Sequence, residues 1–508
     1  MRLAILIFGA LNAILYAGLT PLWEGFDEPF HYGYVQHMWN SRTLLVQKHT
    51  CLSEEVWQSF RFAPASFIVQ RNLPMVTTFD DYFRLPAADR LARRSALEQL
   101  DPKLADVSSQ TPNYESQQAP LAYVVLAPFH ALWAHSPLPV RVWRLRLLCA
   151  LTGLLATGLL VLRLAKLLAV DGNAALFLLF SSQMFYATTA HITNDCLTVP
   201  LFLLVLTCAV SLYGTRRRWD AIALALALAA GLLTKAYFLA MVPFALILVF
   251  ICCTWRERVL FTLVSLGPSV LWYVRNVRLY GDLGGQQENI GGTPVRAMLA
   301  AVFQIPWPKA LVATARSSLW EGNSSATTFG SVTIWLMIAL LAAALVCYLR
   351  RRPPAAECVV IAGMLSYGAG LFYNTLVQWV SSRGDSITPA PWYVQLLAAP
   401  GFCLAMAGLA RSGRAGSLLR SAMCWLWAYV ICATYVAKLV PMYGGYGSGP
   451  ARLAEIARWY WGSLPRIREA LSTTAMISPT ALFVLTGCVV IAAVTLAWRL
   501  SLSSNAAP

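Results

Sequence analysis

Apolar segments of similar length recur along this chain and are separated by short polar turns. An α-helix needs about 20 predominantly apolar residues to cross the hydrocarbon core of a bilayer. The pattern predicts an all-α integral membrane protein with about twelve transmembrane helices. We expect them over residues 3–20, 143–165, 173–190, 196–213, 219–234, 236–253, 259–277, 331–349, 357–379, 392–410, 421–440 and 479–498.

The longest polar stretch follows the first apolar segment and reaches about Gln118. Acidic, basic and aromatic residues are mixed throughout it, so it cannot cross a bilayer and is expected to fold as part of a loop over residues 21–142. The run from Pro120 to Trp133 is short for a span and contains Pro128 and His130. We expect it to be an interfacial helix on the membrane surface, with a true span as the alternative. The first apolar segment has no small-residue cleavage pattern after it and is expected to be retained.

Orientation follows from the short loops, because Lys and Arg in such loops remain on the cytoplasmic side. With both termini cytoplasmic, the Arg-rich turns at 163–166, 216–218, 256–258, 350–352 and 411–420 all fall inside. The loops 21–142, 278–330 and 441–478, the 191–195 turn and Lys235 then share the opposite side. We therefore expect the chemistry of the protein to lie on the extracytoplasmic face.

Composition supports a membrane protein and argues against a nucleic-acid-binding protein. Hydrophobic residues make up 58% of the chain and charged residues 12%, against about 25% charged in soluble domains. The net charge of +16 resides largely in short clusters between apolar segments, which are topology signals rather than a nucleic-acid-binding surface. Most of the 12 cysteines lie inside apolar segments, without the spacing of a disulfide framework or a metal site.

Ionisable residues crowd the end of the first span, where Asp27, Glu28 and His31 lie within five positions. Charged groups at that depth are costly and usually functional. A carboxylate here can act as a general base whose pKa is tuned by apolar surroundings and an acidic neighbour. The alternative is a helix start, where acidic residues interact favourably with the helix dipole.

An Asp-Glu pair a few residues beyond the first span, followed by His, resembles the signature of the GT-C superfamily of polyprenol-phosphate-sugar-dependent glycosyltransferases. It is similar in particular to bacterial relatives of the protein O-mannosyltransferases and the lipid A aminoarabinose transferases. The resemblance implies a GT-C fold in a bacterial inner membrane, with the active site facing the periplasm. It also implies that Asp27 is the catalytic base and that Glu28 belongs to the same catalytic pair, where it would orient the acceptor or share a divalent metal ion.

Further segments resemble the superfamily in the expected order. Residues 113–123, which include Glu115, resemble a polar-Gln-Pro-Pro-Leu-Tyr-Tyr segment, although Ala119 replaces its first proline. The 190–195 turn resembles the second acidic motif, with Asp195 as its acid; the alternative is a cap of the next helix. The segments 232–235, 272–282 and 378–391 also resemble superfamily segments. This resemblance implies that Lys235, Arg275 and Arg383 bind the donor phosphate. The aromatic residue usual after the last arginine is missing.

The resemblance covers residues 2–410, so we divide the chain into a catalytic module, 1–410, and C-terminal helices, 411–508. It implies an inverting sugar transfer from a polyprenyl-phosphate donor to a hydroxyl of a glycolipid, polysaccharide or protein acceptor. His31, Glu115 and Asp195 would orient the acceptor or hold a divalent metal ion, which stays open. The rival hypotheses are a lipid or saccharide transporter or flippase, which would show repeats and midplane charges, and a non-catalytic cell-envelope assembly protein.

Overall fold

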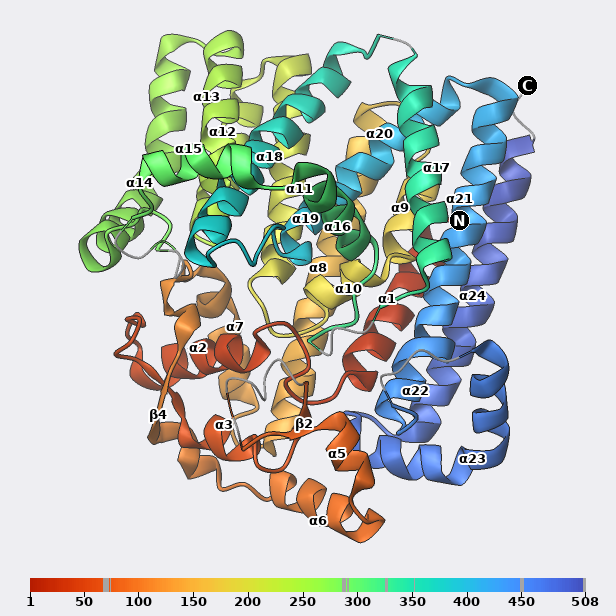
Figure 1. Ribbon diagram of the computed structural model, residues 1–508. Helices are drawn as coiled ribbons and strands as arrows, with labels where there is room; N and C mark the ends of the chain where they lie inside the picture. The colour runs from red at the N-terminus through yellow and green to blue at the C-terminus, as the bar shows by residue number, and fades with distance from the viewer. Residues whose placement is uncertain are drawn as a thin grey trace.

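The computed structural model describes residues 1–66, 73, 75–285, 289, 292–324, 328–350, 352–447 and 452–505. Most of the described chain is helical, and the long helices run roughly side by side (Figure 1). These long helices and their short companions are α1 (Arg2–Leu19), α8 (Leu138–Leu167), α9 (Gly172–Phe180), α10 (Gln183–Thr189), α11 (Asp195–Thr215), α12 (Arg218–Leu232), η3 (Ala236–Ala240), α13 (Met241–Cys252), α14 (Trp255–Tyr280), α17 (Ser331–Leu349), α18 (Ala355–Ser381), α19 (Pro391–Val394), η5 (Gln395–Leu397), α20 (Ala398–Ala410), α21 (Gly413–Ala433), η6 (Thr434–Leu439), α22 (Val440–Tyr443) and α24 (Pro479–Asn505).

The connecting segments contribute shorter elements. They are α2 (Glu28–Ser41), β1 (Cys51–Ser53), α3 (Glu54–Ser59), β2 (Pro64–Ala65), β3 (Thr77–Thr78), α5 (Phe79–Arg84), α6 (Ala87–Glu98), η1 (Pro102–Asp106), β4 (Ser108–Pro112), η2 (Tyr114–Gln117), α7 (Leu121–Leu132), α15 (Val295–Gln304), α16 (Trp307–Leu319) and α23 (Leu453–Thr474). The strands form two small sheets, in which β1 pairs antiparallel with β4 and β2 pairs parallel with β3.

All twelve segments expected to span the membrane are helical, so the all-α membrane architecture is confirmed. Among the described residues, eight helices are long and apolar enough to cross a bilayer, and a ninth if α15 and α16, bent by 87°, count as one span. The remaining expected spans are α9 with α10, α12, η3 with α13, and α14. The first three are short or interrupted, and α14 carries charges near both ends. The expected number therefore exceeds the number that meets the full spanning criteria.

The break between α9 and α10 is buried, and polar side chains satisfy the backbone there. The carbonyl oxygen of Phe180 accepts hydrogen bonds from Asn12 Nδ2 at 3.1 Å and from the Tyr186 hydroxyl at 2.8 Å. Ser182 Oγ donates to the carbonyl of Leu178 at 2.8 Å. In a membrane interior, non-helical backbone persists only where the protein itself supplies such partners.

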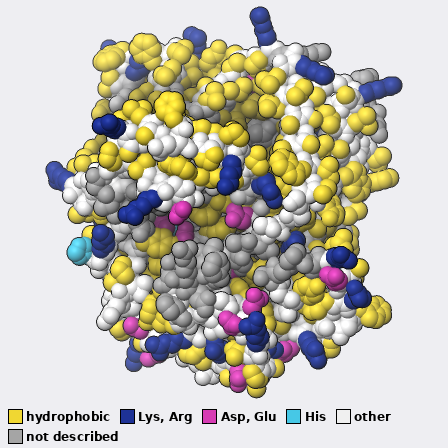
Figure 2. All heavy atoms as spheres, viewed as in Figure 1, with side chains coloured by type: hydrophobic (Ala, Val, Ile, Leu, Met, Phe, Trp, Pro, Cys, Tyr) yellow, Lys and Arg dark blue, Asp and Glu magenta, His cyan; other side chains and the backbone are white. Residues whose placement is uncertain are grey.

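The elements of the 21–142 loop gather at one end of the bundle together with α23, whereas the α11–α12 and α17–α18 turns lie at the other end (Figure 1). Helices α6 and α23 are joined by an ion pair between Arg90 and Glu469 at 2.5 Å. A hydrogen bond from Arg94 to the carbonyl of Ala475, at the end of α23, adds to this contact at 3.2 Å. Figure 2 shows hydrophobic side chains over the upper part of one face and acidic ones in its middle and lower parts. With 12 residues, α7 is too short to span a bilayer of ordinary thickness.

Candidate active site

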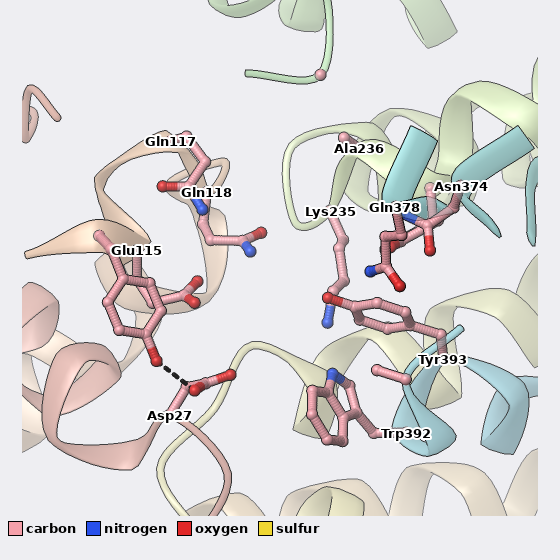
Figure 3. Close-up of a pocket in the computed structure, with 14 residues that line it drawn as sticks. Asp27, Glu115, Gln117, Gln118, Lys235, Ala236, Asn374, Gln378, Trp392 and Tyr393 are labelled. Atoms are coloured by element: carbon pink, nitrogen blue, oxygen red, sulfur yellow. Dashed lines mark hydrogen bonds between the residues drawn. The ribbon is translucent and has the colours of Figure 1, made fainter. Parts of the chain in front are cut away.

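The elements of the 21–142 loop, together with α23, form what we call the loop layer. A cavity of about 310 Å³ lies where this loop layer meets the long helices (Figure 3). Its lining comes from the start of α2, from η2, from the α12–η3 junction, from α18 and from α19. The lining residues are Asp27, Tyr114, Glu115, Gln117, Gln118, Lys235, Ala236, Tyr237, Gly284, Asn374, Gln378, Ala390, Trp392 and Tyr393. Ligand pockets usually begin at about 300 Å³, so a small ligand fits this cavity.

Asp27 stands at the N-cap of α2 in an unusual backbone conformation. Its φ of 56° is left-handed, a conformation that is unfavourable for most L-residues but that Asp adopts more readily than most. The side chain makes no capping bond to α2 and instead lines the cavity. There its Oδ1 accepts a hydrogen bond from the hydroxyl of Tyr114. Burial, followed by the charge of Asp27, raises the pKa of Tyr114 well above its usual value, so Tyr114 remains a neutral donor.

Glu28, the neighbour of Asp27, does not line the cavity and is fully buried against α8. Arg146 binds both of its carboxylate oxygens, at 2.6 and 2.5 Å. The same guanidinium donates to the carbonyls of Thr20 at 2.5 Å and Pro21 at 2.7 Å, just beyond α1. The Glu28 carboxylate also accepts from the backbone N–H of Ile192 at 3.1 Å. Arg146 thus ties together the end of α1, the Asp27–Glu28 turn and the turn that leads to Asp195.

Lys235 reaches the cavity because the chain turns sharply at the end of α12. Gly231 permits this turn, since a Cβ at that position would lie 2.2 Å from the ring of Phe238. The Lys235 ammonium pairs with Asp195 Oδ1 at 2.6 Å and lies 4.9 Å from the centre of the Tyr393 ring. Both members of the ion pair are buried. The structure therefore places a cation in the cavity wall and its counter-ion directly behind it.

Glu115 lies beside Tyr114 in η2 and is only 5% exposed. Its Oε2 has no hydrogen-bond partner within the part of the chain that the structure describes. Burial, and then the charge of Asp27, raise the pKa of Glu115 to about 8. Glu115 is therefore largely protonated at neutral pH.

Three other predicted site residues lie outside the cavity lining. His31 Nδ1 is 2.8 Å from the Tyr123 hydroxyl, and burial lowers the pKa of this histidine well below its usual value. Arg275 donates to the carbonyl of Leu45, and its guanidinium lies 4.8 Å from the ring centre of Trp272. Arg383 is exposed in the turn after α18. Of the eight predicted site residues, Asp27, Glu115 and Lys235 line the cavity, and Asp195 contacts it through Lys235.

The cavity also contains residues that the sequence analysis did not select. Tyr114 and the two glutamines belong to the 113–123 segment, but their side chains were not assigned a task. Asn374 and Gln378 lie one turn apart on α18, and two amides on one face of an apolar span were an available signal. Trp392 and Tyr393 gave no such signal because aromatic residues are common near membrane surfaces.

No set of three or more His, Cys, Asp or Glu side chains is arranged to hold a metal ion among the described residues. Asp27 and Glu115 are close enough to interact electrostatically, but Asp195 is engaged by Lys235 and His31 by Tyr123. The divalent ion that the sequence analysis left open stays a prediction.

Two further hollows extend the cavity toward the outside of the bundle. The first, of about 220 Å³, shares Ala236, Tyr237 and Gly284 with the cavity. The second, of about 640 Å³, shares Leu239 and Leu283 with the first and runs between η3, α13 and α14. Its lining is apolar apart from a few polar groups. Together the hollows form an apolar track that starts next to Lys235 and ends on the flank of the protein.

No protein-family model matches this chain, and no curated protein matches it in sequence. Among solved structures, the chain is similar to ArnT from Cupriavidus metallidurans bound to undecaprenyl phosphate, with 13% identity and a TM-score of 0.49. That match covers 98% of this chain and 76% of the other. It is also similar to the same enzyme in the apo state, with 15% identity and a TM-score of 0.39, covering 84% of this chain and 70% of the other.

Proposed function

We propose that this protein is an integral membrane glycosyltransferase that moves a sugar from polyprenyl phosphate to an acceptor hydroxyl, with Asp27 as the general base. One observation carries the proposal. A carboxylate, Asp27, and a buried cation, Lys235, line the same cavity, and that cavity continues into an apolar track. Such a site offers a base, a phosphate contact and a place for a lipid chain.

In the proposed reaction, Asp27 takes the proton of the acceptor hydroxyl while that oxygen attacks the anomeric carbon. The bond between the anomeric carbon and the phosphate oxygen breaks, and polyprenyl phosphate leaves with the electron pair. A single displacement inverts the configuration at the anomeric carbon. The hydrogen bond from Tyr114 orients the Asp27 carboxylate, and Lys235 stabilises the charge that develops on the leaving phosphate.

The other residues predicted to be catalytic or to bind phosphate lie outside the cavity lining, so we do not give them those roles. Glu28 is held by Arg146 outside the cavity, so we assign it to positioning Asp27 rather than to proton transfer. Arg275 and Arg383 lie outside the cavity lining, so we assign the phosphate contact to Lys235. Asp195 pairs with Lys235 and holds it in place at a buried position.

We further propose that the cavity faces the extracytoplasmic side. The Arg-rich turns of α11–α12 and α17–α18, which favour the cytoplasm, lie at the end of the bundle opposite the loop layer (Figure 1). The lipid chain of the donor would occupy the apolar track, and the acceptor, a glycolipid, polysaccharide or protein, would enter from the loop layer. An interfacial position for α7 agrees with this orientation.

The test is sugar transfer by membranes that contain the Asp27→Asn variant, with radiolabelled polyprenyl-phosphate sugars as donors. We expect transfer to fall by about 10²-fold or more, because proton transfer by a positioned base typically contributes 10²–10⁴-fold. Asp89→Asn, an exposed change in the same loop layer, is the matched control and should leave transfer unchanged. Unchanged transfer by Asp27→Asn at wild-type protein levels would refute the assignment.

A further inference from the structure

Four side-chain amides line the cavity, and they come from two opposite walls. Gln117 and Gln118 lie at the end of η2. Asn374 and Gln378 face them from α18 (Figure 3). Lys235 extends between the two walls in the same view. Polar residues inside an apolar span such as α18 are costly unless they have a partner or a ligand.

Two of these amides have buried oxygens that the protein itself does not satisfy. Gln117 Oε1 and Asn374 Oδ1 have no hydrogen-bond partner within the described residues, and the two side chains are 9% and 3% exposed. Buried polar atoms are nearly always hydrogen-bonded in folded proteins, so an unpaired pair at one cavity indicates that a ligand supplies the partners. An unpartnered oxygen of Glu115 lines the same cavity.

The other two amides are held in fixed orientations. Gln118 Oε1 accepts from Asn194 Nδ2 at 3.1 Å, and Gln378 Oε1 accepts from Ser386 Oγ at 3.3 Å. Trp392, on the floor of the cavity, is also fixed, because its ring stacks on Phe26 with centroids 4.4 Å apart. The walls are thus preorganised, with an aromatic ring beside a set of amides.

The chemistry of the amide selects the ligand. An amide offers both a donor and an acceptor, and a hydroxyl group can serve either one, whereas a phosphate oxygen only accepts and an ammonium only donates. At about 30 Å³ per water molecule, the cavity has room for roughly ten waters. In a cavity of this size, a single sugar ring next to Lys235 is large enough to reach both walls.

Building on the proposed transferase function, we propose that Gln117 and Asn374 are specificity-determining residues that read the hydroxyl groups of the donor sugar. The sugar attached to the phosphate at Lys235 lies between them, and its hydroxyls complete their hydrogen bonds. A donor sugar that lacks hydroxyls on the faces toward these amides binds more weakly.

The experiment measures the binding of two probes to the full-length protein in nanodiscs. One probe is a short-chain polyprenyl phosphate, and the other is the same lipid carrying glucose. We expect Gln117→Leu and Asn374→Leu each to weaken binding of the sugar-bearing probe by about tenfold, the value of one lost hydrogen bond, and to leave binding of the sugar-free probe unchanged. Equal losses for both probes, or no loss for either, would overturn the proposal.

A matched control comes from Asn173, whose Oδ1 is likewise buried without a partner within the described residues but lies at the start of α9, outside the cavity lining. Asn173→Leu should change neither affinity. A second arm compares glucose with its monodeoxy analogues on the same lipid, and equal binding of all of them contradicts a hydroxyl-reading role. If wild-type protein binds neither probe, the lipid-donor function fails; if it binds both equally, only the sugar-reading role fails.

Discussion

The hydroxyl of Tyr114 donates a hydrogen bond to the carboxylate of Asp27, although 87 residues separate them in the chain. Tyr114 comes from η2 of the loop layer, and Asp27 from the turn after the first span. This bond fixes the carboxylate inside the cavity.

The Tyr114→Phe substitution tests that bond. Phenylalanine keeps the ring that packs against Phe30 at 4.0 Å but removes the donor. A hydrogen bond to a charged group contributes about 1.5–3 kcal/mol, so we expect kcat for sugar transfer to fall by roughly 10- to 100-fold. The KM for the lipid donor should change little, because Tyr114 contacts the base rather than the phosphate. A rise in KM with unchanged kcat would contradict an orienting role.

The pH dependence of stability tests the environment of Glu115. Its pKa in the folded protein is about 8, against an ordinary value of 4.5, because burial and the charge of Asp27 disfavour ionisation. Between these two values the folded state binds more protons than the unfolded state, so Glu115 lowers stability progressively as pH rises. Above about pH 8 the loss is complete.

Glu115→Gln removes this titration and keeps the shape of the side chain. We expect the melting temperature of the variant, relative to wild type, to rise from about pH 5 to about pH 8 and then to level off. Thermal unfolding in detergent, followed at several pH values, gives the comparison. A constant difference across that range would show that Glu115 ionises with an ordinary carboxyl pKa.

Variants of the buried pair of Lys235 and Asp195 distinguish the effect of the pair on stability from its effect on sugar transfer. Lys235→Met leaves the Asp195 carboxylate buried and unpaired, which should cost about 3–5 kcal/mol of stability. The double variant Lys235→Met/Asp195→Asn removes both charges and should regain most of that stability without regaining sugar transfer. Recovery of transfer in the double variant would exclude Lys235 as the phosphate contact.

Arg146 and Arg141 offer a matched comparison on one helix, α8. Arg146 pairs with Glu28 beside the Asp27 turn, whereas Arg141 pairs with Glu55 in α3. Substitution by lysine removes the two-bond pair of Arg146 with Glu28 and the single bond of Arg141 to Glu55, so it should lower stability in both variants. Only Arg146→Lys should also lower kcat by tenfold or more, because it alone loosens the backbone that holds Asp27. Equal kcat values would show that the Glu28 pair serves stability alone.

The pattern of apolar residues was sufficient to predict where the helices lie, because spanning a bilayer imposes a length and a composition that are local properties of the chain. Within the described residues, four of the twelve expected spans fall outside the helices that meet the length and composition of a membrane span, and three of these four are short or interrupted. The break between α9 and α10 is an example: Asn12 and Tyr186, which satisfy its backbone, reach it from a distant helix and from the next turn.

Candidate chemistry was only partly predictable. Asp27, Glu115 and Lys235 could be selected from the sequence, and the structure places all three around one cavity. Asp27 and Glu28 are adjacent in the chain, yet the left-handed backbone at Asp27 sends one side chain into the cavity while Arg146 holds the other outside it. Arg275 and Arg383 could not be distinguished from Lys235 by residue type alone.

The sequence by itself determined that this is a helical membrane protein and that its acidic residues cluster beyond the first span, because lipid selects for apolar helices residue by residue. Only the tertiary structure decided which side chains share the cavity. Residues 27, 114, 235 and 374 meet because four separate elements pack together, and such long-range contacts depend on the whole set of helix interfaces rather than on any local pattern.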